Sequence, residues 1–140
     1  MIGRLHAVLA RYPELAAAYL FGSTARGTAG PESDVDVGLV FKERGVGSRE
    51  NFRLIADLAS RLEAGTAPRP VDVVALEDQG AIFCHRVLLE GRRIFEGDRK
   101  RRIDFESDTI VRALDFRPTY DLAIGGRLAG LRRWLSQRRP

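Results

Sequence analysis

Apolar residues recur along the chain with two different spacings, which predict both helices and strands. Apolar positions three or four residues apart predict helices over residues 2–11, 48–65, 81–89 and 98–114, and a last helix from Pro118 to Trp134. Short apolar or alternating runs predict strands over residues 15–21, 34–41, 70–76 and 93–95. The pattern therefore predicts a mixed α/β (α+β) fold.

Residues that favour turns or helix ends refine these boundaries. Gly27 and Gly30 mark a loop between the first two predicted strands. Ser48 is expected to cap the helix that follows it, with Glu50 in its first turn. Pro118 is expected to interrupt the last helical segment, because proline lacks the backbone N–H that a helix interior uses.

The composition is that of one globular domain. The chain has 140 residues, of which 44% are hydrophobic and 30% are charged. This length excludes separate cofactor and substrate domains. Residues 1–96 carry 12 basic and 13 acidic residues, whereas residues 97–140 carry 11 and 6. We expect a balanced core over 1–96 and a basic helical extension over 97–140, within the same compact unit.

The net charge of +4 raises the question of a nucleic-acid partner. The basic excess lies in the C-terminal helices, where arginine stems can pack while their charged heads stay in water. Few aromatic residues interleave with these charges, as a platform for single-stranded nucleic acid would require. We therefore expect no direct nucleic-acid binding, and we consider these helices better suited to an acidic protein partner.

The N-terminus and the lone cysteine bear on cellular location. Arg4, Arg11 and Glu14 break any apolar core of a signal peptide, and no apolar run approaches the length of a membrane span. Cys84 excludes an intramolecular disulfide and a multi-cysteine zinc site, and its apolar neighbours predict a buried, inert thiol. We expect a cytoplasmic protein that does not associate with membranes.

Two acidic residues begin one predicted strand, and a third lies near the start of another. Asp34 and Asp36 are two residues apart, so in a strand they point to the same face, and Asp72 lies on the strand predicted over 70–76. Clustered carboxylates repel each other by about 3 kcal/mol per pair at a separation of roughly 5 Å. Divalent cations remove this repulsion, and hard oxygen ligands suit Mg²⁺, which can act as a pair of ions on substrate phosphates.

Gly22 and Ser23 follow the apolar run 15–21 and form a candidate phosphate-binding turn. Glycine lets the backbone approach an anion, the hydroxyl and N–H groups can bind it, and Arg26 can add a cation. Alone, Gly-Ser is commonly just a turn, and Asp-x-Asp is commonly a solvated strand edge. Together, with ten residues between Ser23 and Asp34, they predict a site for a metal-bound nucleoside triphosphate.

This set resembles the signature of the minimal nucleotidyltransferases (MNT), within the DNA polymerase β-like nucleotidyltransferase superfamily. The MNT pattern reads Gly-Ser-x-Ala-Arg-Gly and then Ser-Asp-x-Asp-x-x-Val, and the matching segments are residues 22–27 and 33–39. The last position departs from the pattern, with Leu39 in place of valine. The resemblance covers about residues 2–95 and implies a small mixed β-sheet flanked by helices, with C-terminal helices added.

The resemblance also implies a role for most of these residues. Gly22 and Ser23 would hold the triphosphate of ATP. Asp34, Asp36 and Asp72 would ligate two Mg²⁺ ions, and Asp72 would help to deprotonate the acceptor hydroxyl. The implied reaction is in-line attack on the α-phosphorus, which transfers AMP and releases pyrophosphate.

MNT proteins commonly act as antitoxins beside a HEPN ribonuclease toxin, adding AMP to a tyrosine of the toxin. By resemblance, we expect a Mg²⁺-dependent protein adenylyltransferase with a HEPN-like toxin as its partner. Two alternatives stay open. The chain could neutralise a toxin by binding alone, or it could transfer the nucleotide to a small molecule such as an aminoglycoside, for which a homodimer could build the acceptor pocket.

Overall fold

A computed structural model describes residues 1–27, 30 and 33–123, and of residues 116–123 the backbone alone. Its helices are α1 (Ile2–Leu9), α2 (Gly22–Ala25), α3 (Phe52–Thr66), α4 (Ala81–Glu90) and α5 (Arg99–Ala123), with a short 3-10 turn η1 (Leu76–Asp78). Its strands are β1 (Leu15–Phe21), β2 (Val35–Phe41), β3 (Val71–Ala75) and β4 (Arg92–Glu96). These elements confirm the mixed α/β fold expected from the apolar pattern.

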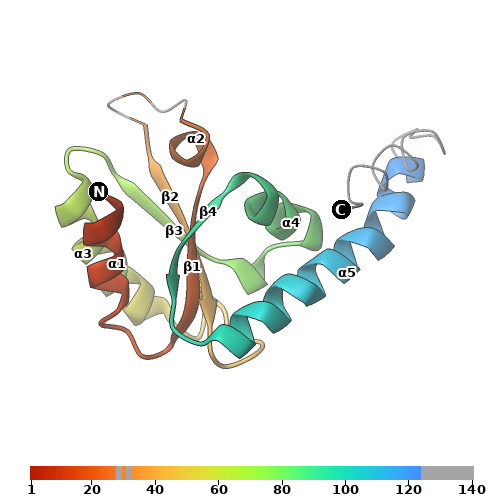
Figure 1. Ribbon diagram of the computed structural model, residues 1–140, viewed down its shortest axis with the longest axis horizontal. Coiled ribbons are helices and arrows are strands. Elements are labelled where there is room, and N and C mark those ends of the chain that lie inside the picture. Colours follow the sequence, from red (N-terminus) through yellow and green to blue (C-terminus); the bar gives the residue numbers. More distant parts are fainter. Residues whose placement is uncertain (28–29, 31–32, 124–140) are drawn as a thin grey trace.

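The four strands form one mixed sheet in the order β3-β2-β1-β4 (Figure 1). β1 runs antiparallel to both β2 and β4, whereas β2 and β3 are parallel. Parallel strands need a crossover connection, and α3 supplies it between β2 and β3. Because β2 and β3 run in the same direction, their first residues meet at one edge of the sheet.

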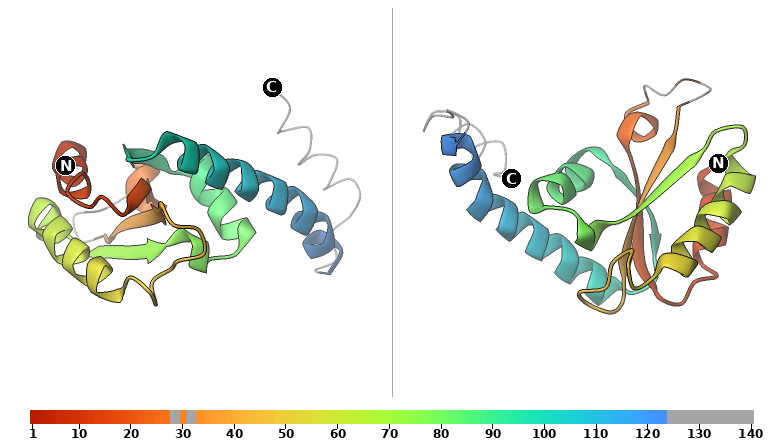
Figure 2. Two further views of the ribbon diagram at one scale, coloured as in Figure 1. Left: turned by 90° about the horizontal axis from the view of Figure 1, so that it is seen from below. Right: turned by 180° about the vertical axis from the view of Figure 1, so that it is seen from behind.

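Helices cover both faces of this sheet, with α1 and α3 on one face and α4 and α5 on the other (Figures 1 and 2). The core under α1 and α3 contains Leu5, Leu9, Val37, Leu39, Leu58 and Leu62. The core toward α4 and α5 contains Ala17, Tyr19, Val40, Val87 and Phe105. Burial on both faces explains why β1 is a continuous apolar run instead of an alternating one.

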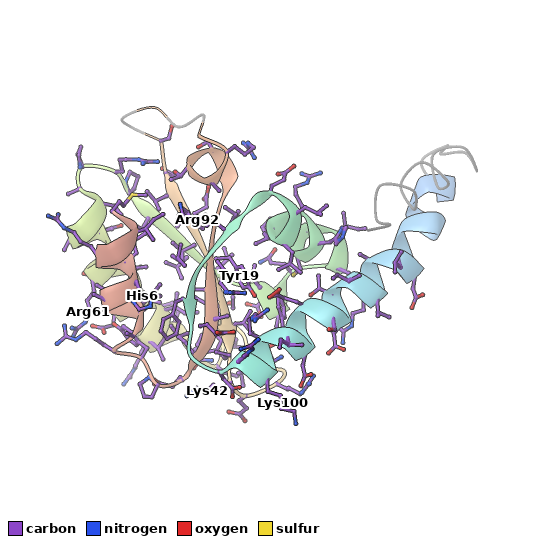
Figure 3. All side chains as sticks on the ribbon, viewed as in Figure 1. His6, Tyr19, Lys42, Arg61, Arg92 and Lys100 are labelled. Atoms are coloured by element: carbon purple, nitrogen blue, oxygen red, sulfur yellow. The ribbon has the colours of Figure 1, made fainter. Side chains whose placement is uncertain are left out.

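α5 contacts the rest of the fold through a narrow stripe of residues four apart. These are Arg101, Phe105, Thr109 and Ala113, each at most 6% exposed. Nε of Arg101 donates a hydrogen bond of 3.0 Å to the carbonyl of Phe41, and its guanidinium pairs with Glu77. Tyr19 in β1 lies on the side of the sheet that faces α5 (Figure 3). Its hydroxyl donates to the carboxylate of Glu106 at 3.0 Å. Part of the positive charge of this helix, that of Arg101, is therefore buried and paired within the fold.

The cap expected for α3 is wrong. The helix begins at Phe52 with Asn51 as its first flanking residue, and no side chain caps it. Ser48 lies three residues farther back, where its N–H donates to Asp78 of η1 at 2.9 Å and its hydroxyl bonds to the same carboxylate. The Ser48 hydroxyl is occupied by this tertiary contact, so it does not serve the helix.

The break expected at Pro118 is also wrong. α5 continues through this position to Ala123, because proline removes only its own backbone donor and the helix bonds on either side remain. The predicted end near Trp134 lies outside the described residues. Among the residues that the structure describes, no helix has the apolar length that a membrane crossing requires. The division into a core over 1–96 and an extension over 97–140 stays a prediction.

Candidate functional site

A glycine at the end of β1 lies directly against an acidic residue of β2. Gly22 has a φ of +72°, a conformation that side-chain-bearing residues rarely adopt. A Cβ atom at this position would lie 2.2 Å from Oδ2 of Asp36. Glycine is therefore required here both for its backbone conformation and for the space beside the Asp36 carboxylate.

The three predicted acids gather at the edge where β2 and β3 begin. Asp36 pairs in register with Asp72 across the parallel strands and with Phe21 across the antiparallel strands. Asp34 lies just before β2, which begins at Val35, so the strand starts one residue later than expected. Asp34 is exposed, Val35 is buried and Asp36 is half-buried, an alternation that keeps both carboxylates away from the core.

The pKa of the Asp36 carboxyl group is affected by its acidic neighbours. Burial raises its pKa above the usual value, and the charges of Asp72 and Asp34 raise it further. The positive charge of Arg26 acts in the opposite direction and lowers this pKa. The carboxylates thus interact electrostatically, and a cation bound among them would relieve their repulsion.

The acidic residues fit a Mg²⁺ site of the kind that a substrate completes. In the described part of the chain, no three His, Cys, Asp or Glu side chains converge into a ready-made metal cage. Mg²⁺ is usually held by one or two carboxylates together with substrate phosphates and water. Asp36 and Asp72, in register on adjacent strands with Asp34 beside them, are hard oxygen donors of that type.

α2 carries the remaining residues of the predicted nucleotide-binding set. Ser23 follows Gly22 in this short helix and is partly exposed. Arg26, at the C-terminal end of α2, pairs with Glu90 of α4 at 3.7 Å, and the two side chains are 49% and 46% exposed. The fold therefore brings the residues singled out in the sequence to one edge of the sheet.

Arg69 belongs to the same region, although no motif in the sequence singles it out. Its Nε donates to the carbonyl of Ser33 at 2.9 Å, and its Nη2 donates to the hydroxyl of Thr24. The Thr24 hydroxyl in turn donates to the carbonyl of Asp34 at 3.3 Å. Arg69 therefore ties α2 to the backbone that carries Asp34. Its position three residues before Asp72 is the only signal in the sequence, and it does not distinguish Arg69 from other arginines.

Cys84 is confirmed as a buried thiol. It is 4% exposed, and its Sγ donates to the carbonyl of Leu76 at 3.0 Å. Burial, with a smaller contribution from Glu77, raises its pKa to about 11. A thiol in this state is protonated near neutral pH and is a poor nucleophile.

A cavity of about 370 Å³ opens at the far ends of β2 and β3, among residues 44–47, η1, α4 and α5. The acidic cluster lies at the opposite ends of these two strands. Four of the charged residues that line this cavity form two ion pairs, Arg44 with Asp108 at 3.2 Å and Arg101 with Glu77. The candidate functional site is therefore the acidic edge and not this larger cavity.

Known proteins are similar to this chain in sequence. Residues 4–100 match the family described as "Polymerase beta, Nucleotidyltransferase". The protein adenylyltransferase MntA of Shewanella oneidensis is 29% identical over 83 residues, which are 59% of this chain and 55% of that protein. The chain thus spans about half the length of this curated relative.

Solved structures show the same fold. A toxin–antitoxin structure with AMP-PNP has a TM-score of 0.70 and 22% identity, and the match covers 89% of this chain and 95% of that one. A structure of a tri-AMPylated Shewanella oneidensis HEPN toxin in complex with an MNT antitoxin has a TM-score of 0.63 and 21% identity, over 89% and 97% of the two chains. The family match over most of the described residues confirms the resemblance seen in the sequence: the chain belongs to the polymerase beta nucleotidyltransferase family.

Proposed function

We propose that this chain is a Mg²⁺-dependent adenylyltransferase that moves AMP from ATP to a tyrosine hydroxyl of a HEPN-type toxin, and that it acts as the antitoxin. The observation that carries the proposal is the position of Asp36, which lies against Gly22 on one side and is in register with Asp72 on the other. Nucleotidyl transfer requires such proximity between a phosphate-binding turn and carboxylates that can hold metal ions.

The proposed roles follow from the chemistry of each side chain. Asp34, Asp36 and Asp72 would hold two Mg²⁺ ions, while Gly22 and Ser23 would hold the triphosphate. Bound there, Mg²⁺ would offset the charge of the phosphates and of the leaving oxygen. The acids repel one another in the absence of a cation, which favours cation binding.

The proposed transfer forms one phosphorus–oxygen bond and breaks another. The acceptor oxygen attacks the α-phosphorus of ATP, and the bond from that phosphorus to the bridging oxygen breaks, so that pyrophosphate leaves. Asp72, which is exposed at the start of β3, would take the hydroxyl proton. Arg26 would stabilise negative charge on the phosphates.

The proposal of a HEPN-type partner is based on the similar proteins described above. MntA is named a protein adenylyltransferase, and one solved complex holds an MNT antitoxin with a tri-AMPylated HEPN toxin. We extend both properties to this chain, and the excess of basic residues in the sequence of 97–140 would suit an acidic partner. Because ATP is the donor, we expect the reaction to take place in the cytoplasm.

A labelling experiment tests the proposal directly. The chain is incubated with labelled ATP, Mg²⁺ and the protein encoded by the adjacent reading frame. We expect covalent label on a tyrosine of that protein, located by mass spectrometry, and none when Mg²⁺ or this chain is left out. No label in the complete mixture would overturn the proposal. Label on an aminoglycoside without any partner protein would instead support transfer to a small molecule.

Mg²⁺ and ATP together are expected to raise the melting temperature of the chain, because they bind the native state and not the unfolded state. At a ligand concentration of about one hundred times Kd, such binding raises the free energy of unfolding by about 2.7 kcal/mol. This corresponds to a rise of several degrees in the melting temperature. Melting in EDTA, in Mg²⁺ alone, in ATP alone and in both together measures the effect. An unchanged midpoint at millimolar Mg²⁺ and ATP would contradict the proposed site.

Replacing Arg69 with glutamine is expected to lower kcat for transfer by about tenfold to a hundredfold. The change frees α2 from the backbone at Ser33, and small displacements of reacting groups are costly. Arg69→Lys should behave similarly, because lysine cannot make both contacts in a fixed plane. Arg61→Gln, on the exposed face of α3, is the control and should have no effect on transfer. Full rescue by lysine would show that charge matters here and not the two-point contact.

A further inference from the structure

A second cavity, of about 170 Å³, adjoins the acidic site on the side of α4. Its apolar lining is Phe21, Phe83 and Val87. Its polar lining is Arg26, Arg86 and Glu90, and Gly22 completes it. We call this the α4 pocket. None of its residues on α4 belongs to the motifs that identified the acidic site.

The apolar part of the α4 pocket is an aromatic surface. The rings of Phe21 and Phe83 meet edge to face, with centroids 5.6 Å apart and planes at 85°. Val87 is buried, whereas Phe83 is 38% exposed, a high value for so large an apolar side chain. Planar rings pack favourably against such aromatic surfaces.

The polar part of the α4 pocket combines two cations with one carboxylate. Arg26 and Glu90 are 3.7 Å apart and each about half exposed, so their pairing is weak and can be exchanged for a ligand contact. Arg86 is exposed on the same helix as Glu90. This set matches a ligand that is anionic, has a planar ring and donates a hydrogen bond. A nucleotide whose base carries an amino group has these three properties. The phenol ring of a tyrosine acceptor is neutral, so it has no negative charge for Arg26 and Arg86 to bind.

Gly22 connects the α4 pocket to the acids. It lines the pocket, and the place where its Cβ would be lies 2.2 Å from Oδ2 of Asp36. A ligand whose ring lies on Phe83 can therefore extend its phosphates past Gly22 toward Asp36 without crossing any side chain at position 22.

We infer that the α4 pocket binds the base of the donor nucleotide, with Phe83 as its packing surface and Glu90 as the acceptor for an exocyclic amino group. This inference rests on the proposed nucleotidyl transfer and adds base selection to it. At position 6 of the purines and position 4 of the pyrimidines, adenine and cytosine carry an amino donor where guanine and uracil carry a carbonyl oxygen. With Glu90 facing that position, its carboxylate favours ATP and CTP over GTP and UTP.

The test compares the binding of ATP with that of inorganic tripolyphosphate, both with Mg²⁺, by isothermal titration calorimetry. Tripolyphosphate has the phosphates without the base. Phe83→Ala is expected to weaken ATP binding by about tenfold and to leave tripolyphosphate binding unchanged, because only the base loses its packing surface. Leu89→Ala is the matched control: Leu89 is on the same helix, is 60% exposed and does not line the pocket.

A second variant tests base selection without disturbing the aromatic surface. Glu90→Gln offers an amide that can both donate and accept, so the preference of the chain for ATP over GTP should fall severalfold. Because Glu90 also pairs with Arg26, tripolyphosphate binding is measured in parallel, and the change in base preference is judged relative to it. Circular dichroism and melting of each variant verify that it is folded, and Phe83→Leu keeps apolar packing in case the alanine variant is unstable.

These measurements need no acceptor, so they separate this inference from the proposed function. Equal losses for ATP and tripolyphosphate in Phe83→Ala would overturn the inference, as would unchanged binding of both. If a separate transfer assay shows that Phe83→Ala raises the KM for the acceptor protein while ATP binding is unaffected, the pocket serves the acceptor and the inference is wrong. If the wild-type chain labels no acceptor yet shows the expected binding pattern, the base pocket stands and the proposed transfer fails.

Discussion

Asp36→Asn is expected to reduce AMP transfer at least about a thousandfold. Asparagine keeps the shape of the side chain next to Gly22 but removes the charge that would hold Mg²⁺. Metal ions typically contribute several kcal/mol of transition-state stabilisation, and each 1.4 kcal/mol is about a factor of ten in rate. The measurement is the initial rate of label transfer from ATP to the acceptor protein.

The same substitution is expected to leave the chain at least as stable as the wild type at neutral pH. Burial and the charges of Asp72 and Asp34 raise the native-state pKa of Asp36, so the native chain holds this proton more tightly than the unfolded chain does. The stabilisation that this proton provides is fully present at pH values below the unfolded-state pKa. It is lost as the pH rises through the raised native-state pKa. Asparagine cannot ionise, so this loss should be absent in urea unfolding measured from about pH 4 to pH 8.

Two further variants complete this test. Asp108→Asn, on α5 and far from the acidic edge, controls for a general effect of removing one carboxylate and should transfer AMP normally. Transfer at the wild-type rate by Asp36→Asn would contradict the proposed metal site. The double variant Asp34→Ala/Asp36→Ala decides how the antitoxin works in cells: protection against the toxin that survives the double change would mean that binding alone is sufficient.

Gly22→Ala is expected to reduce transfer by about a hundredfold. The new Cβ would fall 2.2 Å from Oδ2 of Asp36, so either this carboxylate or the turn after β1 must move. Displacing a catalytic group by about 1 Å can cost a hundredfold in rate. Alanine also disfavours the φ of +72°, which adds a stability cost of about 1–2 kcal/mol. Label transfer and urea unfolding measure the two effects separately.

Gly45→Ala is the matched control for the backbone effect. Gly45 has nearly the same conformation, with a φ of +74°, but among the described residues no atom beyond its own chain neighbours lies within 4 Å of its Cβ position. Both variants should lose similar stability, and only Gly22→Ala should lose transfer. If both variants lose transfer equally, the contact with Asp36 is not the reason that position 22 is glycine.

Local patterns in the sequence were sufficient to locate most elements and part of the site. The apolar runs of β1 and β2 and the helical spacing of α3 and α4 depend on which residues must be buried, and burial is periodic along each element. Ser48 and Pro118 were misjudged for a related reason. Their local preferences do not act alone: the Ser48 hydroxyl bonds to Asp78, and α5 continues through Pro118 although an interior proline is costly.

By itself, the sequence determined the residue types and spacings of the site, because Gly22-Ser23 and Asp34-x-Asp36 each act within a few residues of chain. Only the tertiary structure decided how distant groups come to lie against them, including Asp72, which the sequence had named as a candidate. Asp72 reaches Asp36 through the parallel register of β2 and β3, and Arg69 contacts Ser33 from 36 residues away. Phe83 and Glu90 reach the site because α4 packs beside α2. Such contacts depend on strand pairing and on helix packing over both faces of the sheet, and no short segment of sequence encodes either of them.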